Sequence, residues 1–320
     1  MEKTGFERYG LSGNPFRDLS SENLEDVEIF HVPQFIDKDI HEIREETLNK
    51  ENKAVIALMG GLGAGKTERL LLLKKEADRR GAFCVVGGVT TETQWMVKNI
   101  LDSMLDKKIN GGRKGSGKWI RSVKKASKWI SKYGADYDPE AIGRVIAEVL
   151  NANVPAFLLV NDLHRLPEKE DMDQFLQILY VVTNAIVPGV LVVLSGDEKY
   201  FKGVLYSNAT LNERINRKLV IPPLSVREAE LMIAKRLLAK RLVDDMDPLY
   251  PFTSDSIIAL NGMAKGNPRA LLKYADFLLE NAVKARAVQI DEDLVKVMVE
   301  QNETVNLISD AEEETSTPSA

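Results

Sequence analysis

One glycine-rich stretch, preceded by an apolar run and followed by an amphipathic one, constrains this sequence more than any other feature. Residues 54–59 are all apolar, as expected for a buried strand of a parallel sheet. Residues 60–67 read GGLGAGKT and match the whole pattern G-x-x-x-x-G-K-[ST], whose backbone N–H groups surround a phosphate chain. A helix predicted from residue 68 presents its positive N-terminal end to the anion. The stretch therefore predicts a nucleotide site in an α/β fold.

The loop residues have separate expected roles toward ATP and Mg²⁺. Lys66 is expected to reach the β- and γ-phosphates, and the Thr67 hydroxyl is expected to hold Mg²⁺. The predicted cofactor-binding residues of the loop are Gly60, Gly61, Leu62, Gly63, Ala64, Gly65, Lys66, Thr67 and Glu68. A chance match is the alternative, and the strand before the loop and the helix after it argue against that alternative.

Composition narrows the class of protein and its compartment. The 320 residues are 44% hydrophobic and 28% charged, which is ordinary for a globular protein, and the net charge of −5 gives no overall nucleic-acid signal. Cys84 is the only cysteine, so no intramolecular disulfide forms and a reducing, cytoplasmic setting is expected. The apolar runs are too short to span a bilayer, so no membrane partner is expected, and three scattered histidines do not make a zinc site.

Short apolar runs alternate with helical stretches through the first two thirds of the chain, which predicts an α/β fold with a five-stranded parallel sheet. The runs lie at 54–59, 82–86, 156–160, 189–194 and 218–221. The helical stretches between them lie at 68–80, 94–105, 139–150 and 172–185. After Pro222-Pro223 only helices are predicted, and Ser225 with Glu228 forms a capping box before the first of them. These helices lie at 225–242, 254–263, 268–285 and 291–300.

This pattern divides the chain into four expected segments. Residues 1–50 are a lead-in segment that packs beside the nucleotide site, and residues 51–223 are a phosphate-loop ATPase domain with a basic insertion at 107–135. Residues 224–302 are an all-helical lid domain. Residues 303–320 are acidic and poor in apolar side chains, which predicts a disordered tail.

The third apolar run ends in Asn161-Asp162, where nucleotide-hydrolysing proteins usually have Asp-Glu. In the usual pair the Asp holds Mg²⁺ and the Glu polarises the attacking water. Asn161 and Asp162 occupy these two positions in one register. In the other register Asp162 is the magnesium acid and Leu163 leaves the polarising position empty. An N-cap role is a further alternative for Asp162. In either register the carboxylate pair is absent, which predicts nucleotide binding with slow or partner-dependent hydrolysis.

Further polar side chains are expected near the phosphates. Ser195 ends the fourth apolar run and is predicted to lie next to the γ-phosphate, with a turn-forming hydroxyl as the alternative. Arg214 and Arg217 precede the fifth run, and Arg214 is the preferred candidate for an arginine that reaches a neighbouring subunit's phosphate site. Arg269 begins a lid helix and is predicted to contact the same phosphates. Solvated surface arginines are the alternative for all three.

Residues 107–135 contain ten lysines and arginines, no acidic residue, and the aromatic residues Trp119, Trp129 and Tyr133. One helical face would carry Ile120, Val123, Ile130 and Tyr133. A basic face with aromatic rings suits contact with the phosphate backbone of DNA or RNA. The predicted DNA-binding residues are Arg113, Lys114, Lys118, Arg121, Lys124, Lys125 and Lys128. A solvated amphipathic helix with core tryptophans is the alternative.

Taken in order, these motifs resemble the AAA+ ATPases, and most closely the clade of origin-recognition initiators, ExeA-like ATPases and transposition regulators. The matching pieces are SGNPF at 12–16, GGLGAGKT at 60–67, FLLVNDLHRL at 157–166, VVLSGD at 192–197, LNERINRKLVIPPLS at 211–225 and GNPRALL at 266–272. The resemblance implies ATP bound between subunits, with Arg214 as the finger and Arg269 as the second sensor. It also implies that the 107–135 insertion faces DNA.

The altered Asp-Glu pair departs from the resemblance, and no winged-helix domain is expected after the lid. Both features favour DNA contact through an ATPase ring or filament over sequence-specific origin binding. The expected function is an ATP-binding protein that assembles on duplex DNA as a homo-oligomer with weak sequence preference, acting alone or with another DNA-acting enzyme. A signalling-type NTPase switch that docks a protein partner and an ExeA-like transport ATPase are the alternatives.

Overall fold

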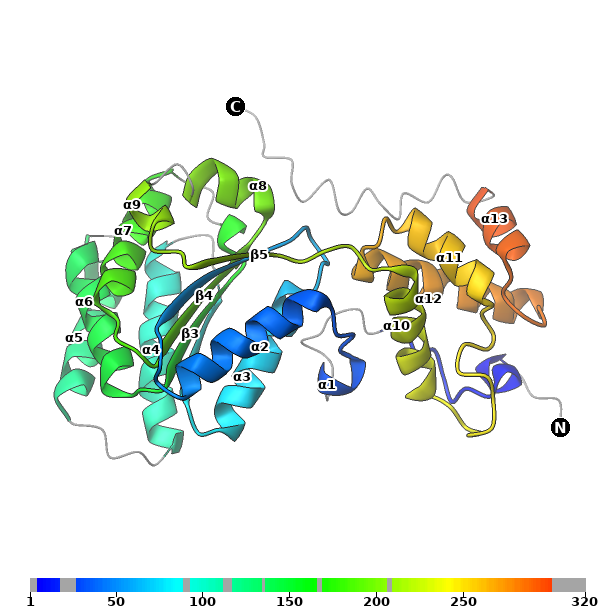
Figure 1. Cartoon of the computed structure of the whole chain (residues 1–320), viewed down its shortest axis with the longest axis horizontal. Helices are drawn as coiled ribbons and strands as arrows, with labels where there is room; N and C mark the ends of the chain where they lie inside the picture. Colours follow the sequence, from blue (N-terminus) through cyan, green and yellow to red (C-terminus); the bar gives the residue numbers. More distant parts are fainter. Residues whose placement is uncertain are drawn as a thin grey trace. The chain divides into compact units, whose positions relative to one another are not determined.

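The computed structural model describes residues 5–17, 27–88, 93–111, 117–133, 136–165, 169–205 and 209–300. These residues form two compact units. The α/β unit holds Phe35–Gly61 and Lys66–Ile221. The helical unit holds Leu62–Gly65 together with the described residues before Phe35 and after Ile221. Figure 1 labels helices and strands of both units.

A five-stranded sheet forms the centre of the α/β unit. Its strands are β1 (Ala54–Met59), β2 (Phe83–Gly88), β3 (Ala156–Asn161), β4 (Val190–Gly196) and β5 (Arg217–Val220). They pair in the order β2-β3-β4-β1-β5, and every pairing is parallel. The predicted fold class and five-stranded parallel sheet are therefore confirmed. Because β4 lies between β1 and β3, the carboxyl ends of these three strands meet at one edge of the sheet.

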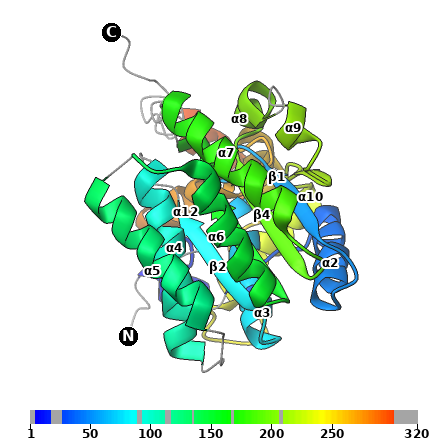
Figure 2. The same cartoon turned by 90° about the vertical axis from the view of Figure 1, so that its left-hand side faces the viewer.

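Helices cover both faces of the sheet (Figures 1 and 2). One face is covered by α2 (Phe35–Leu48) and α3 (Lys66–Arg79). On the other face lie α4 (Thr93–Gly111), α5 (Gly117–Tyr133), α6 (Pro139–Ala152) and α7 (Lys169–Ala185), with α5 packed on α4 and α6. The strands β1 and β4 are buried along their whole length, which explains their continuous apolar runs.

Short helical turns that the sequence does not predict follow β3 and β4. They are a 3₁₀ helix at Leu163–Arg165, α8 (Glu198–Tyr200), a π-helical turn at Phe201–Leu205 and α9 (Ala209–Asn212). Within the described ranges, no helix is both long and apolar enough to cross a bilayer.

The helical unit has its own hydrophobic core. Its helices are α1 (Val27–Phe30), α10 (Val226–Leu238), α11 (Ser254–Met263), α12 (Pro268–Ala285) and α13 (Glu292–Glu300). The predicted capping box of Ser225 and Glu228 is present at the start of α10. A 3₁₀ helix at Gly5–Tyr9 and the following turn add apolar side chains to this core, and Phe16 packs edge to face on Phe252 with ring centroids 5.8 Å apart.

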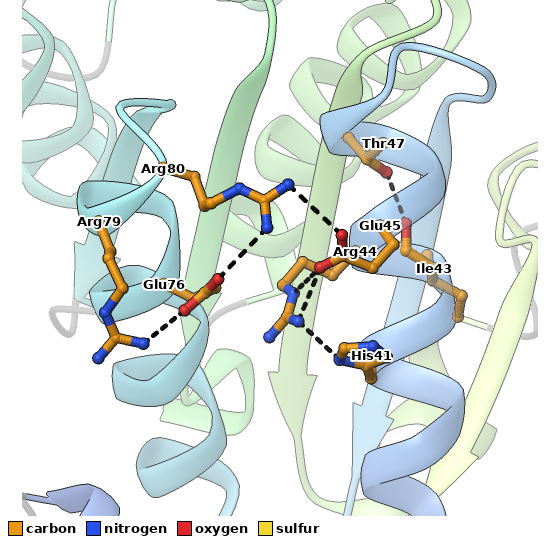
Figure 3. Close-up of polar contacts among 8 residues, drawn as sticks. All are labelled: His41, Ile43, Arg44, Glu45, Thr47, Glu76, Arg79 and Arg80. Atoms are coloured by element: carbon orange, nitrogen blue, oxygen red, sulfur yellow. Dashed lines mark hydrogen bonds and ion pairs between the residues drawn. The ribbon is translucent and has the colours of Figure 1, made fainter.

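Ion pairs join α2 to α3 near both ends of the two helices. Near their beginnings, the buried Arg69 donates two hydrogen bonds to Asp37, at 2.8 and 3.0 Å. Near their ends, Glu45 accepts a hydrogen bond from Arg44 at 2.8 Å and lies 3.6 Å from Arg80 (Figure 3). Breaking a buried ion pair costs about 3–5 kcal/mol. The Asp37–Arg69 pair therefore fixes the first turn of α3, directly after the glycine-rich loop.

Glu45→Gln is expected to lower the free energy of unfolding by roughly 0.5–1 kcal/mol at about pH 7 and by less at about pH 3. The hydrogen bond from Arg44, together with the charges of Arg44, Arg80 and His41, holds the pKa of Glu45 below its usual value of 4.5 despite partial burial. A carboxyl group whose pKa is lowered by folding adds stability above its unfolded pKa, and loses that contribution as the pH falls through the folded pKa.

Urea unfolding of the native chain and of Glu45→Gln at both pH values measures this difference. Glu42→Gln is the matched control, because Glu42 is an exposed carboxylate of the same helix whose paired Lys38 lies 3.9 Å away. Its effect should stay within about 0.5 kcal/mol at either pH. An equal loss for Glu45→Gln at both pH values would contradict the prediction.

Candidate functional site

The loop between β1 and α3 has the backbone that a phosphate loop requires. Gly63 and Gly65 have φ values of +78° and +93°, in the left-handed region that glycine adopts without strain. A Cβ atom at residue 63 would lie 2.6 Å from Cβ of Arg269 and 2.9 Å from Oδ1 of Asn267. Glycine is therefore needed at residue 63 both for the turn and for the close approach of the residues that begin α12.

Lys66 is the first residue of α3, and its side chain is turned back onto the loop. The residue is 5% exposed, and Nζ donates to the carbonyl oxygens of Gly60 and Gly61, both at 2.9 Å. A phosphate oxygen is a stronger acceptor for an ammonium group than a carbonyl, because the bond is charge-assisted on both sides. The arrangement places a buried cation at the site where the sequence predicts the phosphate chain. Glu68, also predicted to contact the nucleotide, is partly exposed in the same turn of α3.

Side chains from two neighbouring strand ends and from α3 form a hydrogen-bonded chain. The Ser195 hydroxyl, in β4, donates to Oδ1 of Asn161 at 2.7 Å. Nδ2 of Asn161, the last residue of β3, donates to Oγ1 of Thr67 at 3.1 Å and to Oδ2 of Asp162 at 3.3 Å. The Ser195 hydroxyl also accepts from the backbone N–H of Asp162 at 3.2 Å. The strand order explains the contact, since β4 lies between β1 and β3 and carries Ser195 to their shared edge.

The surroundings of Asn161 and Asp162 differ, which bears on the two registers left open by the sequence. Asn161 hydrogen-bonds with Thr67, the residue predicted to hold Mg²⁺, whereas Asp162 lies one residue beyond the strand. Asp162 has a φ of +54°, a left-handed conformation that Asp tolerates better than most residues and that differs from the extended backbone of an N-cap. The hydrogen bond to Thr67 makes Asn161 the better candidate for the position of the magnesium-binding carboxylate, and that role stays a prediction.

The side chains near Thr67 suit a metal ion whose ligands are mainly phosphate oxygens and water. Within the described ranges, no group of three or more His, Cys, Asp or Glu side chains could hold a metal ion. In nucleotide sites Mg²⁺ takes only one or two protein ligands and completes its octahedral shell with phosphate oxygens and water. The Thr67 hydroxyl and the Oδ1 atom of Asn161 fit that limited role, and Asp162 is the nearby carboxylate.

Residues at the start of α12 lie against the loop, inside the helical unit. Asn267 is the N-cap of α12, and its Oδ1 accepts from the N–H of Ala270 at 3.1 Å. Its Nδ2 donates to the carbonyl oxygen of Leu62 at 2.7 Å. Arg269, the predicted second sensor, is partly exposed, and its side chain has no hydrogen bond or ion pair with another described residue. Its guanidinium group is therefore available for an anion.

Both candidate finger arginines lie on the surface before or at the start of β5. Arg214 is exposed and its side chain contacts no partner among the residues that the structure describes. Arg217 is also exposed, and its guanidinium group donates to the carbonyl oxygen of the adjacent Asn216 at 3.4 Å. Arg214 is thus the less constrained of the two.

Helix α5 buries one face and exposes a basic one. The buried face carries Trp119, Val123, Ala126 and Ile130, which pack in the core with α4 and α6. The exposed face carries Arg121, Lys124, Lys125, Lys128 and Lys132. In the part of the chain that the structure describes, none of these five cations forms an ion pair. Arg113 and Lys114 lie outside the described residues, as does the side chain of Lys118.

The two tryptophans of this basic stretch differ in burial. Trp119 is a core residue that packs edge to face on Phe83, with ring centroids 6.4 Å apart. Trp129 is 47% exposed. Tyr133, expected on one helical face with Ile120, Val123 and Ile130, is 44% exposed, and its ring packs on that of Trp129.

Some candidate residues are missing from the sequence prediction. Asn267 could be recognised from the sequence as an N-cap before Pro268, but its hydrogen bond to Leu62 depends on the approach of α12 to the loop. Lys132 could have been found, because it lies four residues after Lys128 and seven after Lys125 on the same helical face. The Asp37–Arg69 pair has no sequence signal, since it joins two helices of different segments.

Comparisons of sequence give limited matches. No protein-family model matches this chain. The chain is 22% identical over 253 residues to an uncharacterized HTH-type transcriptional regulator of Methanocaldococcus jannaschii. This match covers 75% of the chain but only 61% of that protein, so the chain spans less than two thirds of the length of this relative.

The strand order, the phosphate loop and the helical unit together define the AAA+ fold, and the predicted resemblance is confirmed at the level of the fold. The ORC2 protein of Aeropyrum pernix superposes with a TM-score of 0.55 at 14% identity, over 92% of this chain and 75% of that one. The ORC1 protein of the same organism superposes with a TM-score of 0.54 at 14% identity, over 87% of this chain and 70% of that one. Cdc6p from Pyrobaculum aerophilum superposes with a TM-score of 0.50 at 13% identity, over 83% of this chain and 68% of that one.

Proposed function

We propose that this chain binds ATP with Mg²⁺ and assembles with further copies of itself on DNA, as a ring or filament, when nucleotide is bound. We also propose that it hydrolyses ATP slowly unless a partner stimulates it. The observation that carries the proposal is the glycine-rich loop with Lys66 buried at the start of α3, next to the Thr67–Asn161–Ser195 chain. The ORC2 neighbour, whose structure was solved as ADPNP–ADP complexes, supports nucleotide binding by this fold.

Each residue of the candidate site has a role in this proposal. The loop N–H groups and Lys66 bind the phosphates, and Thr67 with Asn161 holds Mg²⁺, which neutralises charge on the transferred phosphoryl group. Ser195 orients Asn161 through its 2.7 Å hydrogen bond. Arg269 contacts the phosphates of its own chain, and Arg214 reaches the phosphates of a neighbouring copy. These roles make the bound nucleotide part of the contact between subunits.

DNA contact is assigned to the exposed face of α5. Five cations without ion-pair partners among the described residues suit a phosphate backbone, and they carry no base-specific chemistry of their own. The ORC1 neighbour, solved in complex with DNA, supports DNA binding by this fold. The net charge of −5 means that this attraction is local to α5, so weak sequence preference and strong salt dependence are expected.

Light-scattering measurements of size, made with and without ATP and duplex DNA while turnover is followed, test the proposal. The expected result is a larger assembly only when ATP is present, with DNA promoting it further. Arg214→Ala should keep ATP affinity but lower turnover in the assembly by about 10³-fold or more, the usual effect of an arginine finger. Arg217→Ala is the matched control and should change turnover little. A chain that stays monomeric with ATP and DNA would contradict the proposal, and tight ATP binding without any DNA effect would favour a nucleotide switch.

Neutralising Lys124, Lys125 and Lys128 together with glutamine is expected to weaken duplex binding and to make it less salt-dependent. If each lysine contacts one phosphate, the slope of log K against log salt should fall in magnitude by about 2.7, at roughly 0.9 per contact. Fluorescence anisotropy with a labelled duplex over a range of salt concentrations measures both quantities. The charge-matched control replaces three lysines of other helices with glutamine, the exposed Lys38 and Lys296 and the partly exposed Lys74. Equal slopes for the two triple variants would show that α5 is only a solvated helix.

A further inference from the structure

Two aromatic rings at the end of α5 remain exposed beside its basic face. Trp129 and Tyr133 lie one helical turn apart, and their ring centroids are 4.5 Å apart with an interplanar angle of 40°. They are 47% and 44% exposed. An exposed pair of large aromatic rings leaves apolar area in contact with water, which is unfavourable. The core of the α/β unit, which α5 covers with its opposite face, does not use these rings.

The indole ring is held in a defined orientation. Nε1 of Trp129 donates to the backbone carbonyl oxygen of Asp136 at 3.0 Å, and the Tyr133 ring contacts it from the following turn. Nζ of Lys132 lies 4.8 Å from the centroid of the Tyr133 ring. Because its N–H group is hydrogen-bonded and its ring packs on Tyr133, Trp129 loses little side-chain freedom when a planar ligand stacks on it.

The aromatic pair borders the five cations. At 3.6 residues per turn, Arg121, Lys124, Lys125, Lys128 and Lys132 span an arc of about 100° on α5, and the two rings occupy the next roughly 80°. The opposite edge of the cationic arc carries Ser131 and no aromatic ring. A ligand that fits this surface therefore has negative charge along one line and planar apolar groups along one side of it.

We propose that Trp129 and Tyr133 form a stacking site for unpaired bases of a single-stranded nucleic acid whose phosphates lie along the cationic face of α5. In a duplex the base faces are covered by their neighbours, whereas a single strand offers an open π-face beside every phosphate. This inference rests on the proposed DNA binding by α5 and narrows it. The chain then prefers single-stranded or locally opened DNA over an intact duplex.

The test compares binding of labelled oligothymidylate, oligouridylate and a duplex of the same length to the full chain with ATP. Trp129→Ala should bind both single strands about ten-fold more weakly, the usual loss per stacked base, and bind the duplex with unchanged affinity. Trp129→Phe, which keeps a ring, should recover much of the loss. Trp95→Ala is the matched control, since Trp95 in α4 is 46% exposed and lacks a stacked partner among the described residues. Oligothymidylate should also quench tryptophan emission in Trp95→Phe, and this quenching should disappear in Trp95→Phe with Trp129→Ala.

The outcomes separate this inference from the function on which it depends. If the native chain binds none of the three probes, the proposed DNA binding fails and the stacking site with it. If Trp129→Ala binds the single strands as tightly as the native chain, the stacking site is overturned while DNA binding stands. If Trp129→Ala instead changes the size of the assembly and leaves every affinity unchanged, the rings form a protein contact and the inference is overturned. A different loss for the two single strands would identify which of DNA and RNA the site prefers.

Discussion

Lys66→Ala is expected to lower ATP affinity by about 100-fold or more. The ammonium group is buried at the start of α3, and a phosphate chain in the loop would accept its hydrogen bonds in place of the carbonyl oxygens of Gly60 and Gly61. A hydrogen bond between charged groups contributes about 1.5–3 kcal/mol, so losing two of them predicts a change of two to four powers of ten. Isothermal titration of the native chain and the variant with ATP and Mg²⁺ measures the difference.

Two controls distinguish lost phosphate binding from a damaged loop. Lys74→Ala removes a partly exposed lysine two turns further along α3, whose Nζ lies 4.0 Å from Asp78. This variant should leave ATP affinity unchanged. The thermal midpoint of Lys66→Ala without nucleotide should fall somewhat, since the variant removes this donor from the carbonyl oxygens of Gly60, which is buried, and Gly61. ATP should then raise the midpoint of the native chain and not that of the variant. An unchanged affinity in Lys66→Ala would remove the basis of the proposed function.

Much of the α/β unit can be predicted from the sequence because its signals are local. Five continuous apolar runs, each short and separated by helical periodicity, determine a parallel sheet with both faces covered. The capping box of Ser225 and Glu228 and the position of Pro268 are equally local, and the structure has both. The short helical turns after β3 and β4 escape prediction, because turns of three to five residues carry no periodic pattern.

The candidate site is predictable only in part, because its geometry depends on tertiary contacts. The pattern G-x-x-x-x-G-K-[ST] identifies the loop residues from the sequence alone. The choice between the two registers at Asn161 and Asp162 instead depends on where β3 ends relative to Thr67. The exposure of Tyr133 is another property that the sequence pattern does not determine. Periodicity groups it with Ile120, Val123 and Ile130, but at the last residue of α5 its ring packs on that of the exposed Trp129. A periodic sequence pattern gives the least information about the neighbours of a side chain at the end of a strand or helix.

Asn161→Asp is expected to raise the single-turnover rate of ATP cleavage by about 10- to 100-fold at saturating Mg²⁺. The native amide is neutral, and it donates to the Thr67 hydroxyl at 3.1 Å and to Asp162 at 3.3 Å. A carboxylate in its place can only accept, so the Thr67 hydroxyl turns its proton toward residue 161 and leaves its lone pairs for the metal. If the added negative charge stabilises the metal and the transition state by about 1.4–2.8 kcal/mol, the rate rises by the stated factor.

The gain in Asn161→Asp should depend on Mg²⁺ in a way that a general change of structure would not reproduce. Without the metal, the new carboxylate lies beside Asp162, and two like charges at this separation repel each other. The variant should therefore be less stable than the native chain in the absence of Mg²⁺ and recover when Mg²⁺ and ATP are added. Asn161→Ala removes the amide without adding charge, and it should show no gain in rate. Rapid-quench measurements with protein in excess over ATP, made on all three chains, decide the question. A native rate that is already as fast as that of Asn161→Asp would mean that the neutral amide does not limit hydrolysis.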